Sequence, residues 1–324
     1  MIFGHKKNLK FFSRLIEHNR FPHAVLFTGP TKIGKKTTAL EITKYLSQSP
    51  RPKETFLEFS QRKCLSQTCN LINEGKFPGI LKIEEEGDFS IKKIREIREK
   101  LSLSSLYPFK VVILDNAENL SPEATGALLK TLEEPRGKTM FFLIATFPHV
   151  LPKTILSRCE IFKFYPLSRE GIETFIKSEI EEQDIKLTKE KINRILDFSV
   201  GRPGIAKDIL LDKNRLFCYN LLLEDVRKIK HLPISEKMLM AEKLEKGDKI
   251  DDFLFMAEYW FRDLLMIKNR IFLKSQEEEI EKESESFSKR ELKNILWQIQ
   301  KMKKYLLFSN VSRLLAVENF LLKI

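Results

Sequence analysis

The chain has 324 residues, of which 42% are hydrophobic and 31% are charged, and its formal net charge is +12. This length allows two or three domains with separate cores, and no apolar run approaches the roughly 20 residues of a membrane span. Four cysteines are too few for a disulfide framework, and the first residues lack the apolar core of a secretion signal, so a cytoplasmic protein is expected. The positive charge favours an anionic partner such as nucleic acid.

The first half of the chain alternates short apolar runs with helical patterns. Helices are predicted at 35–46, at 91–103 and after Ser121, where Pro122 takes the first helical position and Pro135 is a stop. Continuous apolar strands that alternate with helices predict an α/β fold with a parallel sheet covered on both faces. Five runs rich in β-branched and aromatic residues predict the strands: 23–28, 79–83, 110–114, 140–146 and 160–164.

The strand signal disappears after residue 171, and the rest of the chain is predicted to be helical. Residues 168–208 predict a small helical unit, and residues 213–324 predict several longer amphipathic helices, for example 251–272. The segment 275–291 is highly charged and nearly free of apolar residues. It predicts a solvated connection whose order the sequence leaves open. The apolar residues with helical spacing within 251–272 predict a core: Phe253, Ala257, Trp260, Phe261, Leu264 and Leu265.

The stretch GPTKIGKKT, from Gly29 to Thr37, lies between an expected strand and an expected helix. Gly29, Gly34 and Lys35 match the pattern G-x-x-x-x-G-K-[ST], in which backbone N–H groups and the lysine hold phosphates. The next residue is Lys36 instead of the hydroxyl that normally holds Mg²⁺. Thr37 comes one helix position later, which turns it by about 100° away from the metal. A tight strand-to-helix turn with an exposed lysine is the alternative for this segment.

The apolar run 110–114 ends at Asp115, at the edge of the sheet where α/β proteins bind ligands. An aspartate there suits the shell of a Mg²⁺ ion, and a capping Asp-Asn turn is the alternative. The following Asn116 has no basicity with which to activate a water molecule. Lys36 and Asn116 therefore both depart from the pattern of a nucleotide-hydrolysing site.

Two longer stretches carry a family resemblance. KVVILDNAENLSPEATGALLKTLEEP (110–135) and FFLIATFPHVLPKTILSRCEIFKF (141–164) resemble the clamp-loader subunits of bacterial DNA polymerase III, which are AAA+ P-loop ATPases. The phosphate-loop region and NVSRLLAVENFLLKI (310–324) fit the same family, so the resemblance runs from about residue 5 to the end. The altered catalytic positions favour the delta-prime type of subunit over the gamma/tau ATPase.

The resemblance implies three domains and a set of partners. The domains are an AAA+ sheet domain (1–166), a small helical lid (167–208) and an all-α collar (209–324). The implied assembly is a hetero-pentameric ring with gamma/tau and delta subunits, which loads the sliding clamp onto primer–template DNA as part of the DNA polymerase III holoenzyme. A delta-prime-like member would bind ATP or ADP weakly or not at all, would hold no Mg²⁺ in its own site, and would not hydrolyse ATP.

The resemblance also assigns roles to single residues. It implies that Arg158 of the SRC motif is an arginine finger, which reaches the γ-phosphate of ATP on a neighbouring subunit. The permanent charge and planar fork of arginine suit that role, and an ordinary surface arginine is the alternative. Thr146 matches the residue that senses the γ-phosphate, although capping of a strand explains it nearly as well. Where ATPase members carry an arginine in the lid, this chain has Gly204, with Arg202 two residues earlier.

Two further features of the sequence have weaker functional interpretations. The family often carries a zinc module with four cysteines, but this chain offers only Cys64 and Cys69, so a remnant site with two free thiols and no zinc is expected. The basic residues Lys92, Lys93 and Arg95 could lie near DNA phosphates, and a solvated helix face is the alternative.

Two other functions stay open at this point. One is an active gamma/tau-like ATPase, which would turn over ATP by itself. The other is a stand-alone basic NTPase that binds DNA without any partner subunit, and the motifs LLKTLEEP and SRC argue against it.

Overall fold

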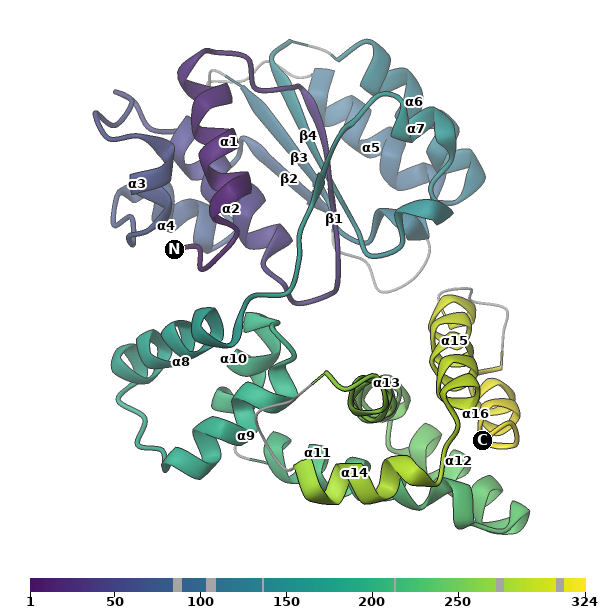
Figure 1. The fold of residues 1–324 in the computed structure, drawn as a ribbon. Coiled ribbons are helices and arrows are strands. Elements are labelled where there is room, and N and C mark those ends of the chain that lie inside the picture. Colours follow the sequence, from purple (N-terminus) through teal and green to yellow (C-terminus); the bar gives the residue numbers. More distant parts are fainter. Residues whose placement is uncertain (84–88, 103–108, 136, 213, 272–276, 307–311) are drawn as a thin grey trace. The chain divides into compact units, whose positions relative to one another are not determined.

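A computed structural model describes residues 1–83, 89–102, 109–135, 137–212, 214–271, 277–306 and 312–324 (Figure 1). Its contacts divide the chain into two compact units. The first consists of Met1–Leu187 and Gly201–Lys207, and the second of Thr188–Val200 and Asp208–Ile324. Within the described ranges, no helix is both long and apolar enough to cross a membrane.

The first unit is built on a parallel sheet, which has five strands in the described part of the chain, in the order β2-β3-β4-β1-β5. Leu26 of β1 lies opposite Leu143 of β4 on one side and Ile161 of β5 on the other. All five predicted strands form, so the predicted α/β class with a parallel sheet is confirmed. The strands are β1 (Ala24–Thr28), β2 (Ile80–Ile83), β3 (Lys110–Leu114), β4 (Thr139–Ala145) and β5 (Glu160–Lys163).

Helices cover both faces of this sheet (Figure 1). Neighbouring residues of a strand point to opposite faces, so Val25 and Phe27 join one core while Ala24 and Leu26 join the other. Both faces are therefore apolar, which explains the continuous hydrophobic runs in the sequence. On the Val25 face lie α1 (Lys6–Glu17), α2 (Lys35–Leu46), α3 (Phe56–Ser60) and α4 (Gln67–Asn73); on the Ala24 face lie α5 (Ile91–Ser102), α6 (Pro122–Glu133) and α7 (Lys153–Leu156).

The start of α6 follows the predicted capping pattern. The side chain of Ser121 accepts a hydrogen bond from the N–H of Ala124 at 3.1 Å, and Pro122 is the first helical residue. The helix ends at Glu133, two residues before Pro135. Short 3₁₀ turns follow two of the strands, at Ala117–Asn119 after β3 and at Pro148–Val150 after β4.

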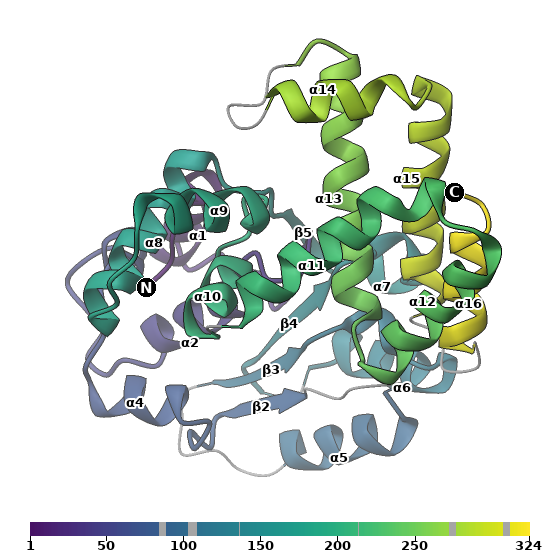
Figure 2. The same ribbon diagram turned by 90° about the horizontal axis from the view of Figure 1, so that it is seen from below.

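The second unit is helical in its described part, as predicted. Its central helix is α13 (Ile250–Lys268), which contacts α11 (Arg215–Lys228), α14 (Glu277–Glu285) and α15 (Lys289–Tyr305) (Figure 2). Phe253, Trp260 and Phe261 of α13 are buried, so the predicted core of this helix is confirmed, although Leu265 is half-buried. The other elements are α9 (Lys189–Ser199), a 3₁₀ turn (Ile229–His231), α12 (Ile234–Lys246) and α16 (Arg313–Leu321).

The predicted lid segment, 167–208, is divided between the two units. Its first helix, α8 (Arg169–Gln183), belongs to the first unit, and α9 belongs to the second. The last helix, α10 (Pro203–Leu211), begins in the first unit and ends in the second. The division into sheet domain, lid and collar stays a prediction.

The prediction of a solvated connection at 275–291 is wrong for the described residues of that segment. Residues 277–285 form α14, and Ser288 caps α15 through a reciprocal pair of hydrogen bonds with Glu291. Ile280 and Phe287 are buried, and Glu283 forms an ion pair with Arg227. Ile280 lies in α14 and Phe287 follows it, and two isolated apolar residues leave no periodic signal in the sequence. Residues 275 and 276 lie outside the described part.

Candidate functional site

The loop between β1 and α2 has a backbone that favours glycine at both of its motif positions. Gly29 has φ of 137°, and a Cβ atom there would clash with the carbonyl oxygen of Phe164. Gly34 is the N-cap of α2 and has φ of 101°. These conformations are available to glycine at little cost. The first N–H groups of α2 have no acceptor within the helix, so this end of the loop favours an anion.

Lys35, the first residue of α2, folds back over the loop. Its Nζ donates hydrogen bonds to the carbonyl oxygens of Gly29 and Pro30, the latter at 2.9 Å. Burial lowers the pKa of Lys35 to about 8, and the negative charges of Glu118 and Asp115 oppose this shift. A phosphate bound at the loop would therefore compete with two backbone acceptors for the ammonium group.

Lys36 lies where the motif would have a metal-binding hydroxyl, and it pairs with Asp115. Its Nζ lies 3.6 Å from Oδ2 of Asp115, and Oδ1 of the same carboxylate accepts the N–H of Asn116 at 3.1 Å. Mg²⁺ requires a nearly octahedral shell of oxygen atoms at about 2.0–2.1 Å. An ammonium group donates no lone pair, repels a divalent cation and engages the carboxylate that would hold it. The residues present therefore do not fit Mg²⁺.

The position after Asp115 also lacks the chemistry of a catalytic base. Asn116 is exposed and adopts the left-handed conformation, with φ of 56°, which asparagine tolerates better than most residues. Its amide cannot accept a proton from an attacking water. The interpretation of this residue as part of a turn that leaves β3 agrees with the conformation.

Glu118 joins the ends of two strands. It is a site residue that the sequence motifs do not identify. Its Oε1 accepts the N–H of Thr146 at 2.8 Å, so the segment after β3 is tied to the end of β4. It is also the carboxylate that acts most strongly on Lys35. Its position three residues after Asp115 is the signal in the sequence that could have placed it near the loop. Its contact with Thr146 spans 28 residues and leaves no local pattern.

Gly204, near the start of α10, packs directly against the phosphate loop. Its N–H donates to the carbonyl oxygen of Lys32 at 2.9 Å, and a Cβ atom at Gly204 would lie 2.8 Å from that oxygen. The position at which the resemblance places a lid arginine thus has no room for a side chain unless the loop shifts. Arg202 lies close enough to Lys35 that its charge adds to the effect of burial on the pKa of Lys35.

The structure brings most of the predicted nucleotide-binding residues to one cavity within the first unit. The cavity has a volume of about 620 Å³, which is in the range of small-molecule sites. Gly29 shapes the loop from behind and does not line the cavity. The predicted residues that do line it are Gly34, Lys35, Thr37, Asp115 and Thr146.

Other residues that line the cavity were not predicted from the sequence. Lys63 pairs with Glu182, and Lys207 pairs with Glu179 at 3.0 Å, so two ion pairs line the side formed by α8 and α10. Phe3, which precedes α1, lines the cavity as well. These residues come from segments far apart in the sequence and match no motif, so no local signal identifies them.

Arg158 lies in the short turn between α7 and β5 and does not line this cavity. Its guanidinium forms an ion pair with Glu133 and donates to the carbonyl oxygen of Thr154 at 2.9 Å. The side chain is 34% exposed, so it is partly accessible from outside the chain. The adjacent Cys159 is buried, and burial raises the pKa of its thiol to about 11.

The basic residues of α5 lie apart from the cavity. Lys92 and Arg95 are exposed and Lys93 is half-buried, while Ile94 and Ile97 bury the opposite side of the helix. None of the three basic side chains lines the cavity at the phosphate loop. Their proximity to DNA stays a prediction.

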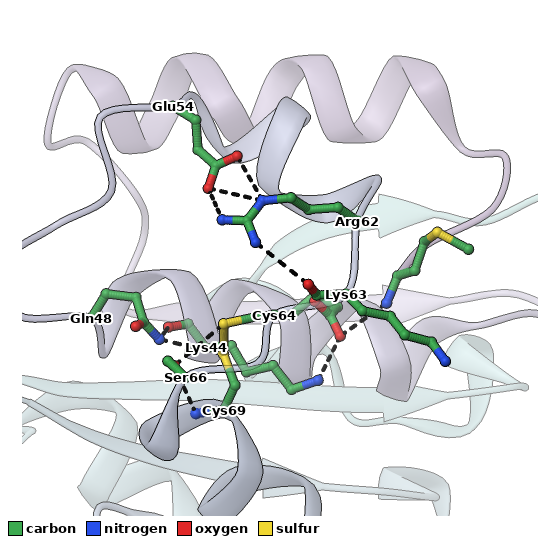
Figure 3. The surroundings of a disulfide bond; sticks show 10 residues. Lys44, Gln48, Glu54, Arg62, Lys63, Cys64, Ser66 and Cys69 are labelled. Carbon is green, nitrogen blue, oxygen red and sulfur yellow. Dashed lines mark hydrogen bonds and ion pairs between the residues drawn. A yellow bond between two sulfur atoms is a disulfide. The ribbon is translucent and has the colours of Figure 1, made fainter.

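The prediction of two free thiols at Cys64 and Cys69 is wrong, because the structure joins them in a disulfide (Figure 3). Ser66 caps α4 by accepting the N–H of Cys69 at 3.2 Å, and this turn places the two Cα atoms 6.0 Å apart. That separation is within the usual range for a disulfide. Gln48 donates to the sulfur of Cys69 at 3.4 Å. Disulfide sulfurs are not thiolates, so this pair does not fit a zinc ion.

Known proteins resemble this chain over its first half and, more weakly, over most of its length. The family model described as DNA polymerase III, delta subunit, matches residues 4–168. A DNA polymerase III subunit gamma from Buchnera aphidicola is 29% identical over 95% of this chain and 90% of that protein. A DNA polymerase III subunit delta′ from Bacillus subtilis is 34% identical over 55% of this chain and 51% of that protein.

Two further comparisons cover different lengths. Subunit tau of DNA polymerase III from Bacillus subtilis is 27% identical over 82% of this chain, which spans 50% of that protein. The crystal structure of a gamma-subunit-related protein from Thermotoga maritima covers 97% of both chains, with 19% identity and a TM-score of 0.45. The family model covers more than half of the chain, so this protein belongs to the DNA polymerase III clamp-loader family.

Proposed function

We propose that this chain is a delta-prime-like subunit of the clamp loader, which supplies Arg158 in trans to a neighbouring ATPase subunit and does not cleave nucleotide itself. The observation that carries the proposal is the pair of Lys36 and Asp115, with Nζ and Oδ2 3.6 Å apart. This pair replaces the metal-binding hydroxyl and engages the metal-binding carboxylate. Asn116 adds the loss of a base at the position where a water would be activated.

The environment of Arg158 supports its action on another subunit. Its partner Glu133 has a side chain that is 47% exposed, and ion pairs at such surfaces contribute only about 0.2–1 kcal/mol. A γ-phosphate offers a higher charge and two oxygen atoms that can accept parallel hydrogen bonds from the guanidinium, so the exchange of partners is favourable. Arginines that act in trans on phosphoryl transfer contribute about 10³–10⁵ in rate.

The proposed partners are gamma/tau and delta subunits in a hetero-pentameric ring, the sliding clamp and primer–template DNA. Membership of the clamp-loader family supports such an assembly. In the second unit, large apolar side chains are exposed, as is expected of a surface that is covered on assembly: Phe217, Ile234, Leu239, Trp297 and Leu315. The exposed Lys92 and Arg95 would give attraction to DNA phosphates without sequence preference.

The test is Arg158→Ala in a reconstituted clamp loader. We expect the ring to assemble while ATP turnover at the neighbouring site falls by about 10³-fold or more, with a parallel loss of clamp loading. Arg158→Lys keeps the positive charge but loses the planar guanidinium. Its ATP turnover should therefore lie between those of Arg158→Ala and the wild type. Arg20→Ala, which removes another exposed arginine of the first unit, is the matched control and should leave turnover unchanged. Unchanged turnover in Arg158→Ala would refute the proposed role.

An active gamma/tau-like ATPase is the second candidate, because the Buchnera gamma relative covers nearly the whole chain. The two candidates differ in what the purified chain does by itself. Turnover of ATP that requires Mg²⁺ and is abolished by Lys35→Ala would favour the motor. We expect no turnover above that of the Lys35→Ala variant.

A further inference from the structure

The phosphate-loop cavity contains a cation that the chain itself provides. The Nζ of Lys36 lies 3.6 Å from the carboxylate of Asp115, and both side chains are partly buried, at 35% and 24% exposure. Both residues line the cavity, as does Thr37 one helix position further on. The ammonium therefore lies beside the carboxylate at the end of β3, between the start of α2 and the sheet.

The charges that line the cavity favour a strongly anionic ligand. Lys63 and Lys207 are balanced by their partners Glu182 and Glu179. The three lysines of the loop line the cavity together with Asp115, and Glu118 also acts on Lys35. The excess of positive charge thus lies where the loop would hold phosphates. The loop lysines are Lys32, Lys35 and Lys36.

Part of the cavity lining is suited to an apolar group. Ile2, Phe3 and Phe175 line it, and the rings of Phe3 and Phe175 meet edge to face with their centroids 5.1 Å apart. A nucleobase packs well against such a surface. One cavity is therefore lined by both basic and aromatic side chains, as a nucleotide requires and a free phosphate does not.

We propose that Lys36 takes the place of a divalent cation, so that this cavity binds nucleoside di- and triphosphates in their metal-free form. The ammonium neutralises Asp115 and part of the phosphate charge, which are the two tasks that a bound metal ion would perform. A Mg²⁺–nucleotide complex carries less negative charge than the free nucleotide and would bring a second cation against Lys36. The inference deepens the proposed function and rests on it in one respect, namely that the chain does not cleave the nucleotide it binds.

The test measures binding of ATP and ADP to the full-length chain by calorimetry, in EDTA and in excess Mg²⁺. We expect binding in EDTA and about tenfold weaker binding in Mg²⁺, a difference of about 1.4 kcal/mol. Lys36→Thr restores the motif G-x-x-x-x-G-K-T and frees Asp115, so in this variant Mg²⁺ should strengthen binding. Thermal unfolding of the variant would verify that the chain is folded.

Two controls separate the proposed mechanism from general electrostatics. Lys63→Thr removes another lysine of the cavity, whose ion-pair partner is Glu182, and binding by this variant should still be weaker in Mg²⁺ than in EDTA. Inorganic tripolyphosphate should bind at least about tenfold more weakly than ATP, because it makes no contact with the aromatic lining residues. Equal affinity for the two ligands would refute the recognition of a nucleoside.

Other outcomes would overturn the inference as a whole. These are tighter binding by the wild-type chain in Mg²⁺, the same effect of Mg²⁺ in Lys36→Thr as in the wild type, or no binding of ATP in either medium. None of these results bears on Arg158, whose effect is measured at the site of the neighbouring subunit. Failure of this inference and failure of the proposed function are therefore distinguishable.

Discussion

The guanidinium of Arg158 is paired with the carboxylate of Glu133, which lies at the end of α6. The pair joins two motifs of the sequence, LLKTLEEP and SRC, that are 25 residues apart at the points of contact. Because both side chains are substantially exposed, the pair restrains the arginine only weakly. Glu133 therefore competes with any phosphate that Arg158 reaches.

Glu133→Gln should make Arg158 more available to a neighbouring subunit. Loss of a competing ion pair of at most about 1 kcal/mol predicts up to a fivefold increase in ATP turnover of the reconstituted clamp loader. Glu134→Gln alters the adjacent exposed carboxylate of the same motif and should have no effect. A decrease in turnover in Glu133→Gln alone would mean that Glu133 positions the arginine instead of competing for it.

Lys35 should make folding stability depend on pH between about 8 and 10.5. Burial is the main cause of its lowered pKa, Arg202 acts in the same direction, and Glu118 and Asp115 oppose both. In this interval the unfolded chain keeps a proton that the folded chain has released, so the free energy of unfolding rises with pH. The total rise from this residue is at most about 3 kcal/mol.

The measurement is denaturant unfolding of the wild type and of Lys35→Met across this pH range. The difference between the two proteins isolates Lys35 from the other lysines and tyrosines that titrate there. We expect the wild type to gain stability relative to Lys35→Met as the pH rises above 8. A constant difference would show that the folded chain does not lower this pKa.

Gly204 should tolerate no larger residue. Gly204→Ala places a Cβ atom 2.8 Å from the carbonyl oxygen of Lys32, and the resulting strain should lower the free energy of unfolding by about 1–3 kcal/mol. Gly126→Ala is the matched control, since this exposed glycine of α6 has open space around its Cβ position and should gain about 0.8–1.0 kcal/mol. Equal stability of both variants, measured by denaturant unfolding, would contradict the close contact at Gly204.

The disulfide between Cys64 and Cys69 should stabilise the region around α3 and α4. The chain-entropy estimate for so short a loop is about 2 kcal/mol. Reductant should therefore lower the free energy of unfolding of the wild type by that amount and leave the double variant Cys64→Ser, Cys69→Ser unaffected. Cys218→Ser, which removes a free cysteine, should respond to reductant like the wild type. An unchanged wild type under reductant would argue against the disulfide.

The sequence by itself determined the sheet, the phosphate loop and the caps, because each leaves a local signal. Strands buried on both faces appear as unbroken apolar runs, and the cap at Ser121 depends on residues within three positions. The glycines of the loop are required by backbone conformations at Gly29 and Gly34 themselves. Local conformation and burial depend on each residue and its neighbours along the chain. The types of the residues and their spacing in the sequence therefore predict them.

Only the tertiary structure decided which side chains meet around the loop. The contact of Glu118 with Thr146, the pair of Lys63 with Glu182 and the contact of Gly204 with Lys32 join segments that no periodicity relates. The same holds for α14, whose few buried side chains depend on the surface against which they pack. Such contacts form only when folding brings distant segments of the chain together. Their free energies depend on both residues of a pair and cannot be assigned to either residue alone.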